Sequence, residues 1–126
     1  MIVKLLVVPI LVGILFTPAC SNAGNLEDDL AKAKAQGKIV MIEIGSVGCI
    51  PCERMKPVME KLRTNYQGKL EVFFVDVKKD LDASRRYGVF IIPTQVFLDK
   101  NGKEFSRHVG YYPFEEIVPV LKKAGL

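Results

Sequence analysis

The sequence predicts an α/β fold in which helices cover both faces of a central mixed β-sheet. Two observations carry this prediction. Segments with helical periodicity alternate with short, mostly apolar runs, in the order helix, strand, helix, strand, helix, two strands, helix. The last two strands flank Asn101-Gly102, a strong hairpin signal. A strand-helix-strand unit implies a parallel pair and a hairpin an antiparallel pair, so the sheet is expected to be mixed.

The expected elements begin with two helices on either side of a strand. Residues 25 to 37 have the pattern of an amphipathic helix, with Asn25 as its N-cap. Residues 38 to 44 are nearly all apolar, as in a strand that is buried on both faces. Helical spacing resumes from residue 49 to 65, and Pro57 is expected to kink that helix.

The second half of the chain is expected to contain a strand, a short helix, the hairpin and a last helix. These elements are predicted at residues 70–77, 81–87, 94–98 with 104–109, and 113–124. Pro119 lies inside the last helix, so a kink or a break is expected there. Because the sequence shows no repeat or low-complexity tract, we expect one domain over residues 24–126.

Residues 1–23 have the layout of a secretory signal peptide. Lys4 precedes an apolar run of twelve residues, and small and turn-forming residues follow it. A membrane-spanning helix needs about 20 apolar residues, so a signal is favoured over an uncleaved anchor. The protein is therefore expected to be exported, either into the periplasm or to a tethered position on the extracytoplasmic side of a membrane.

Two routes of processing stay open for this segment. Ser21 and Ala23 have the small side chains that a signal peptidase requires, which would give a mature chain beginning near Gly24. Alternatively, Ala19-Cys20 resembles the end of a bacterial lipoprotein signal, in which case Cys20 would be lipidated. In either route Cys49 and Cys52 are the remaining free cysteines.

Cys49 and Cys52 form a C-x-x-C pair at the expected start of a helix. A loop this short constrains little of the unfolded chain, so the pair is expected to serve chemistry and not stability. The positive end of the helix dipole stabilises a thiolate on the first cysteine. We therefore assign Cys49 as the nucleophile and Cys52, one turn further in, as the resolving thiol. Pro51 suits the first helical turn.

A set of motifs resembles the thioredoxin family over residues 25 to about 126. The set comprises Ile42-Glu43-Ile44, Gly48-Cys49-Ile50-Pro51-Cys52, Pro57, Tyr87-Gly88-Val89, Ile92-Pro93-Thr94, Asn101-Gly102 and Gly110. The resemblance implies the thioredoxin fold and a thiol-disulfide oxidoreductase. The chain departs from typical members in having no tryptophan, with Gly48 before the first cysteine and Ile-Pro between the two.

The resemblance also implies roles for residues outside the cysteine pair. Pro93 is expected to follow a cis peptide bond and to lie against the cysteines, with Ile92, Pro93 and Thr94 binding an extended substrate segment. Glu43 takes the place of a buried acid with a raised pKa, a possible general base for Cys52. The alternative is that Glu43 reaches solvent or pairs with Lys38. Phe74 stands where the family often has a lysine, which implies a drier site.

The function expected from these features is that of a dithiol reductase. Its substrates would be disulfides of exported proteins, such as apocytochromes, and a membrane thiol-reducing protein would supply its electrons. An oxidase or isomerase is the alternative, because direction depends on reduction potential. A copper-binding thiol module is an alternative of another class, since soft thiolates suit copper(I).

Some ligands and partners are not expected from this composition. The charges of opposite sign are interleaved and sum to +4, which does not predict a nucleic-acid surface. Two cysteines and one distant histidine are too few for a structural zinc site, so no metal is expected. No nucleotide motif is present, and the cysteine pair itself is the expected redox group. We expect a monomer.

Overall fold

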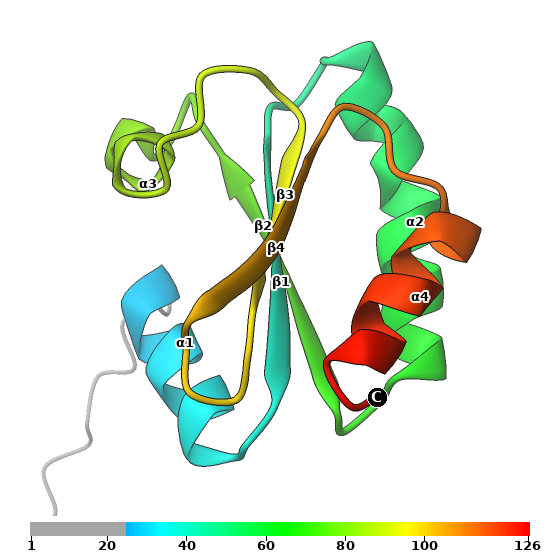
Figure 1. Cartoon of the computed structure of the whole chain (residues 1–126). Helices are drawn as coiled ribbons and strands as arrows, with labels where there is room; N and C mark the ends of the chain where they lie inside the picture. Colours follow the sequence, from blue (N-terminus) through cyan, green and yellow to red (C-terminus); the bar gives the residue numbers. More distant parts are fainter. Residues whose placement is uncertain (1–24) are drawn as a thin grey trace, which may run out of the picture.

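A computed structural model describes residues 25–126 and shows a mixed sheet between two pairs of helices (Figure 1). The elements are α1 (Leu26–Ala35), β1 (Ile39–Gly45), α2 (Ile50–Asn65), β2 (Leu70–Asp76), α3 (Leu81–Arg86), β3 (Thr94–Leu98), β4 (Glu104–Val109) and α4 (Phe114–Lys123). Each predicted helix and strand is present, in the predicted order. The expectations for residues 1–23, including lipidation of Cys20, lie outside the described residues.

The sheet has four strands in the order β2-β1-β3-β4. β1 and β2 form a parallel pair, as a crossover through α2 requires. β1 and β3 form an antiparallel pair. The hairpin at Asn101-Gly102 pairs β3 with β4 in antiparallel. The sheet is therefore mixed, as the sequence predicts, and β1 lies inside it with every residue buried.

Polar side chains cap two of the helices. The Asn25 side chain accepts a hydrogen bond from the N–H of Glu27 at the start of α1, and Asp80 accepts one from the N–H of Ala83 in α3. Cys49 is the N-cap of α2 without a side-chain capping bond, and Pro51 occupies its first turn.

Of the kink or break expected at Pro119, the break does not occur, because α4 continues from Phe114 to Lys123. Proline at this position removes one backbone hydrogen bond, at a cost of about 3 kcal/mol. Ile117 and Leu121 are fully buried on the sheet side of the helix, and each contributes about 1.5–3 kcal/mol. The burial of this face offsets the missing bond. α2 likewise runs without interruption through Pro57.

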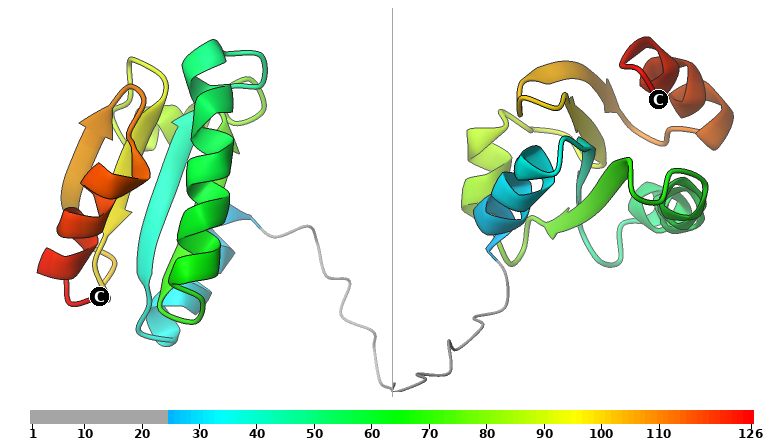
Figure 2. Two further views of the ribbon diagram at one scale, coloured as in Figure 1. Left: turned by 90° about the vertical axis from the view of Figure 1, so that its right-hand side faces the viewer. Right: turned by 90° about the horizontal axis from the view of Figure 1, so that it is seen from below.

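Helices cover the two faces of the sheet in pairs. α1 and α3 lie on one face, and α2 and α4 on the other, as the view along the layers shows (Figure 2). Odd-numbered residues of β1 point toward α2 and α4, and even-numbered ones toward α1 and α3. Between residues 25 and 126, no helix is both long and apolar enough to cross a membrane.

Candidate active site

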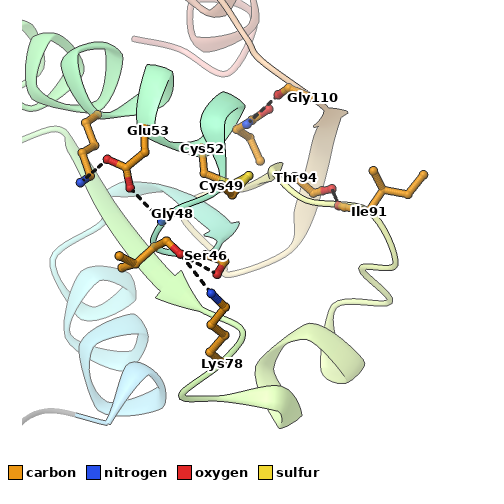
Figure 3. The surroundings of a disulfide bond; sticks show 12 residues. Ser46, Gly48, Cys49, Cys52, Glu53, Lys78, Ile91, Thr94 and Gly110 are labelled. Carbon is orange, nitrogen blue, oxygen red and sulfur yellow. Dashed lines mark hydrogen bonds and ion pairs between the residues drawn. A yellow bond between two sulfur atoms is a disulfide. The ribbon is translucent and has the colours of Figure 1, made fainter.

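The candidate active site lies at the N-terminal end of α2. Cys49, the N-cap, has an extended backbone, and its carbonyl accepts the N–H of Glu53 at 2.9 Å, the first bond of the helix. Cys49 and Cys52 form a disulfide with their Cα atoms 5.2 Å apart (Figure 3). The structure therefore shows the oxidised form of the pair.

The two cysteines differ in their access to solvent. Cys49 is partly exposed, whereas Cys52 is 2% exposed and lies against the sheet. Ile50, between them, is 78% exposed. An incoming thiol or disulfide therefore has access to Cys49 and not to Cys52.

Gly45, the last residue of β1, makes room for Cys52. A Cβ atom on Gly45 would lie 3.1 Å from the Sγ of Cys52 and 3.3 Å from the ring of Phe74. Both distances are shorter than ordinary van der Waals contact, so a larger residue would displace the buried sulfur. The sequence analysis did not identify this role, although a glycine that ends an apolar strand just before the motif is a usable signal.

The loop before Cys49 is held by bonds from two sides. Gly48 has a positive φ of 84°, a conformation that favours glycine, and its N–H donates to the carboxylate of Glu53 at 3.3 Å. Glu53 also pairs with Lys56, and these hydrogen bonds lower the pKa of its carboxyl. From the other side, the Nζ of Lys78 donates to the Val47 carbonyl at 3.2 Å (Figure 3). The Glu53 carboxylate, itself paired with Lys56, and the Lys78 ammonium group therefore hold the loop that leads into Cys49.

Glu43 is fully buried on the same face of β1 as Gly45. Burial raises the pKa of its carboxyl from 4.5 to about 7, and the neighbouring Gln95 opposes a smaller part of this rise. Neither carboxyl oxygen has a hydrogen-bond partner among residues 25–126. The alternative partner, Lys38, instead pairs with Glu71 at 2.5 Å. Glu43 therefore neither pairs with Lys38 nor reaches solvent, and both alternatives are wrong.

Phe74 lies directly beside Glu43, because the two residues are register partners in the β1–β2 pair. The Phe74 ring, which is 38% exposed, also lies near Gly45 and Cys52. An aromatic ring offers no charge to stabilise a carboxylate. The drier surroundings expected from Phe74 therefore agree with the raised pKa of Glu43.

Gln95 lies beside Glu43 on the other side, as its partner in the β1–β3 register. It is 0% exposed, and its Nε2 donates to the carbonyl of Gly110 at 3.1 Å. The N–H of Gly110 in turn donates to the carbonyl of Pro93 at 2.7 Å. The sequence analysis did not select Gln95, although a polar residue in the apolar strand Thr94–Leu98 is a signal of a buried polar contact.

The loop that ends at Pro93 forms another wall of the site. The peptide bond between Ile92 and Pro93 is cis, and Pro93 and Thr94 are buried. The Thr94 hydroxyl donates to the Ile91 carbonyl at 2.6 Å. Figure 3 shows Ile91, Thr94 and Gly110 around the disulfide. Within the described part of the chain, neither the N–H nor the carbonyl of Ile92 makes a hydrogen bond.

Large apolar side chains near the disulfide are exposed. Val47 and Ile50 flank Cys49 in the chain and are 54% and 78% exposed. Phe90 and Ile91, which precede the cis bond, are 96% and 64% exposed. Exposed apolar residues that gather around a site are typical of a surface that binds a partner.

No group of three or more histidine, cysteine, aspartate or glutamate side chains that could hold a metal occurs among residues 25–126. His108 lies on β4 and stacks on the ring of Tyr112, with centroids 3.8 Å apart, and its Nε2 lies 3.2 Å from the Tyr111 carbonyl. The disulfide of Cys49 and Cys52 is itself a redox group that can exchange electrons with a thiol.

Comparisons with known proteins agree with this arrangement. Residues 26–125 match the family model described as a thioredoxin-like domain. Thioredoxin from Staphylococcus aureus is 30% identical over 91 residues, which cover 72% of this chain and 86% of the relative.

Solved structures of two thioredoxins are similar as well. Deadhead from Drosophila melanogaster has a TM-score of 0.67 at 25% identity, covering 79% of this chain and 93% of that one. Thioredoxin NaTrxh from Nicotiana alata has a TM-score of 0.68 at 26% identity, covering 80% and 86%. The predicted fold class and the resemblance are confirmed. The chain belongs to the thioredoxin family and is a thiol-disulfide oxidoreductase whose redox group is the pair Cys49 and Cys52.

Proposed function

We propose that the protein is a dithiol reductase of disulfides in exported proteins, apocytochromes among them. Cys49 is the nucleophile, Cys52 the resolving thiol and Glu43 the general base for Cys52. The observation that carries the proposal is the unequal burial of the two sulfurs above a buried carboxyl. Cys49 is partly exposed, whereas Cys52 and Glu43 are not.

The reaction begins with the reduced pair. The Cys49 thiolate attacks one sulfur of a substrate disulfide, which forms a mixed disulfide and releases the first substrate thiolate. The Cys52 thiol then gives its proton to Glu43, and the Cys52 thiolate attacks the Sγ of Cys49. The second substrate thiolate leaves, and both released thiolates take up protons from solvent. Two electrons pass from the cysteine pair to the substrate, and the pair ends as the disulfide seen in the structure.

Glu43 suits the role of proton acceptor by its place and its pKa. It lies two residues before Gly45 on the same face of β1, a rise of about 7 Å along the strand, and Gly45 contacts Cys52. The proposed proton path between the carboxyl and the thiol includes a bridging water. A base with a pKa of about 7 is half ionised at neutral pH and can both take and return a proton.

The charges near Cys49 support the reducing direction. A thiol-disulfide protein becomes a strong oxidant when its reduced form is stabilised, as by a favoured thiolate. Here the residues between the cysteines are Ile50 and Pro51, which carry no charge, and the carboxylate of Glu53 bonds to the loop before Cys49. Lys56 pairs with this carboxylate, and Lys78 bonds to the same loop, so these charges offset one another and no charge between the cysteines adds to the helix dipole in favouring the thiolate.

The surface around Cys49 supports a protein substrate. The free N–H and carbonyl of Ile92 can pair with an extended backbone, and Phe90 and Ile91 offer exposed apolar contacts beside it. Such a surface selects an unfolded or flexible segment that presents a cystine next to apolar side chains. Apocytochromes, which are unfolded before haem attachment, belong to this substrate class.

The place of action and the electron donor rest on the sequence of residues 1–23. A secretory signal places the mature domain in the periplasm or, if Cys20 is lipidated, on the membrane surface. In such a compartment a membrane thiol-reducing protein supplies the electrons. The interleaved charges and the net charge of +4 support proteins, and not nucleic acids, as partners of a monomer.

The test is the reduction potential of the cysteine pair, measured together with insulin reduction. We expect a potential near ~ −270 mV, and a value above about −150 mV would contradict the reductase, because the pair would then donate its disulfide. Cys49→Ser is expected to lose activity by about 1000-fold or more. Cys52→Ser, its matched control, should still attack and should accumulate a mixed disulfide that identifies substrates. Stoichiometric copper(I) binding without insulin reduction would favour a metal-binding module instead.

A further inference from the structure

A row of side chains crosses the sheet beneath the N-terminal half of α2. Register pairs Phe74 of β2 with Glu43 of β1, Glu43 with Gln95 of β3, and Gln95 with His108 of β4. Register partners point to the same face, with their Cβ atoms about 4.5–5.5 Å apart. Gln95 is therefore the polar side chain in this row that adjoins Glu43.

The hydrogen bonding of this row is incomplete. Both carboxyl oxygens of Glu43 and the Oε1 of Gln95 are buried without a hydrogen-bond partner among residues 25–126. A buried polar atom without a partner is costly, so groups in this condition tend to pair with each other or with an ordered water. Phe74 offers no hydrogen bond, and His108 is already placed by Tyr111 and Tyr112. Gln95 is left as the partner for Glu43.

Gln95 also contacts the substrate side of the site. Its Nε2 donates to the Gly110 carbonyl at 3.1 Å, and the Gly110 N–H donates to the Pro93 carbonyl at 2.7 Å. Gln95 thus lies between the carboxyl beneath Cys52 and the loop that carries the cis bond. The other titratable groups packed on this face are Cys52 and Tyr66 from α2 and its end, His108 from β4, and Tyr111 and Tyr112 before α4, and Gln95 separates His108 from Glu43.

We propose that Gln95 is a positioning residue for the resolving step, because its side-chain amide is the hydrogen-bond partner of Glu43 in both protonation states. An amide carries a donor and an acceptor. Its N–H donates to the ionised carboxylate before Cys52 loses its proton, and its Oε1 accepts from the neutral acid afterwards. The inference rests on the proposed function, in which Glu43 accepts that proton.

The test compares Gln95→Leu with the wild type in the reduced protein. Removal of the amide leaves the ionised form of Glu43 without its donor, so we expect the pKa of Glu43 to rise by about one unit. The pH profile of the resolving step should shift to higher pH by the same amount. Resolution at pH 7 should slow about fivefold. Carboxyl carbon NMR measures the pKa, and rapid mixing with a preformed mixed disulfide at Cys49 measures the resolving rate.

Two further variants serve as controls. Gln95→Asn keeps an amide and should stay nearer to the wild type than Gln95→Leu. Val96→Ala shortens the next residue of β3, which points to the opposite face, and should lower stability without moving the pKa of Glu43. Initial attack by Cys49 should be unchanged in Val96→Ala. Gln95→Met gives the same loss of the amide in an unbranched side chain if Gln95→Leu fails to fold.

The outcomes separate this inference from the proposed function. An unchanged Glu43 pKa and pH profile in the Gln95→Leu or Gln95→Met variant would overturn the role of Gln95, even if Glu43→Gln slows resolution as proposed. If Glu43→Gln leaves resolution unchanged, the base itself is refuted, and Gln95 has no step to assist. In support of the inference, Gln95→Leu should add no further slowing to Glu43→Gln.

Discussion

The two faces of the sheet differ in what they bury. Toward α1 and α3, the strands present mostly apolar side chains to the core, among them Val40, Ile42, Ile44, Val96 and Leu98, and the buried Thr94 hydroxyl is bonded to the Ile91 carbonyl. Toward α2 and α4, an apolar cluster of similar kind gives way, at the end nearest the disulfide, to Glu43, Gln95 and Cys52. Both faces use the same strands, since neighbouring residues of β1 point to opposite sides.

The comparison shows where this molecule gives up stability for chemistry. A mainly apolar face whose one buried hydroxyl is hydrogen-bonded contributes packing. The face under α2 instead holds a carboxyl whose pKa burial raises to about 7 and an amide oxygen without a partner among the described residues. Groups of this kind cost stability, so their presence marks the part of the sheet that serves the reaction. Substitutions on the two faces should therefore have different consequences.

The largest effect is expected on the stability of the oxidised protein as a function of pH. The pKa of Glu43 is about 7 in the folded protein and 4.5 in its ordinary state. Between these values the folded protein binds a proton that the unfolded chain releases, so stability falls as pH rises. The contribution of Glu43 to the free energy of unfolding is present in full below pH 4.5. About 3 kcal/mol of it is lost by pH 8. Urea denaturation at pH 5 and pH 8 measures most of this loss, about 2.5 kcal/mol.

Two variants decide whether Glu43 causes that dependence. Glu43→Gln keeps the shape of the side chain without the ionisation and should remove most of the difference between pH 5 and pH 8. Ile42→Val, its neighbour on the opposite face, should keep the difference. Equal slopes in Glu43→Gln and the wild type would show that the carboxyl is not the group that titrates.

The sequence predicts the sheet face toward α1 and α3 better than the face toward α2 and α4. Periodicity is enough to place the strands and to assign Ile42 and Ile44 to a buried strand, because a nearly continuous apolar run is typical of a strand covered on both faces. The cysteine pair is found from local sequence as well, since its chemistry depends on spacing at a helix start. The family resemblance, and not periodicity, points to Glu43 and to the cis bond at Pro93.

Gly45 and Gln95 could not be placed in the same way. The role of Gly45 depends on where α2 lies above β1, and that of Gln95 on the register between β1 and β3. Neither relation can be read from local sequence. The error at Pro119 has a related cause, because the local cost of proline is visible in the sequence, whereas the burial of Ile117 and Leu121 that offsets it is a property of the packed fold.

A smaller effect is expected from Gly45→Ala on the face under α2. The added methyl group would lie 3.1 Å from the Sγ of Cys52 and 3.3 Å from Phe74, so both must move. Overpacking of this kind costs about 2 kcal/mol. The resolving rate should fall as well, because the displaced sulfur is the one that attacks Cys49. Urea denaturation and rapid mixing with a mixed disulfide measure the two effects.

Gly45→Ala combined with Phe74→Ala shows which neighbour matters. If the aromatic ring is the main obstacle, the double variant recovers part of the stability relative to Phe74→Ala alone. If the sulfur is the main obstacle, no recovery occurs and resolution stays slow. A Gly45→Ala protein with the stability and resolving rate of the wild type would contradict the close contact altogether.

The smallest effect is expected from Ile42→Val on the apolar face. Removal of one buried methylene group should cost about 1 kcal/mol of stability. The reduction potential, the pKa of Glu43 and the resolving rate should all remain at their wild-type values, because Ile42 points away from α2. Glu43 is the next residue of the same strand and points to the opposite face. Ile42→Val therefore tests whether a change of packing on one face affects the chemistry on the other. A shift of the potential or of the Glu43 pKa in Ile42→Val would mean that the backbone of β1 transmits packing changes from one face to the other. The apolar face would then take part in setting the chemistry of the cysteine pair.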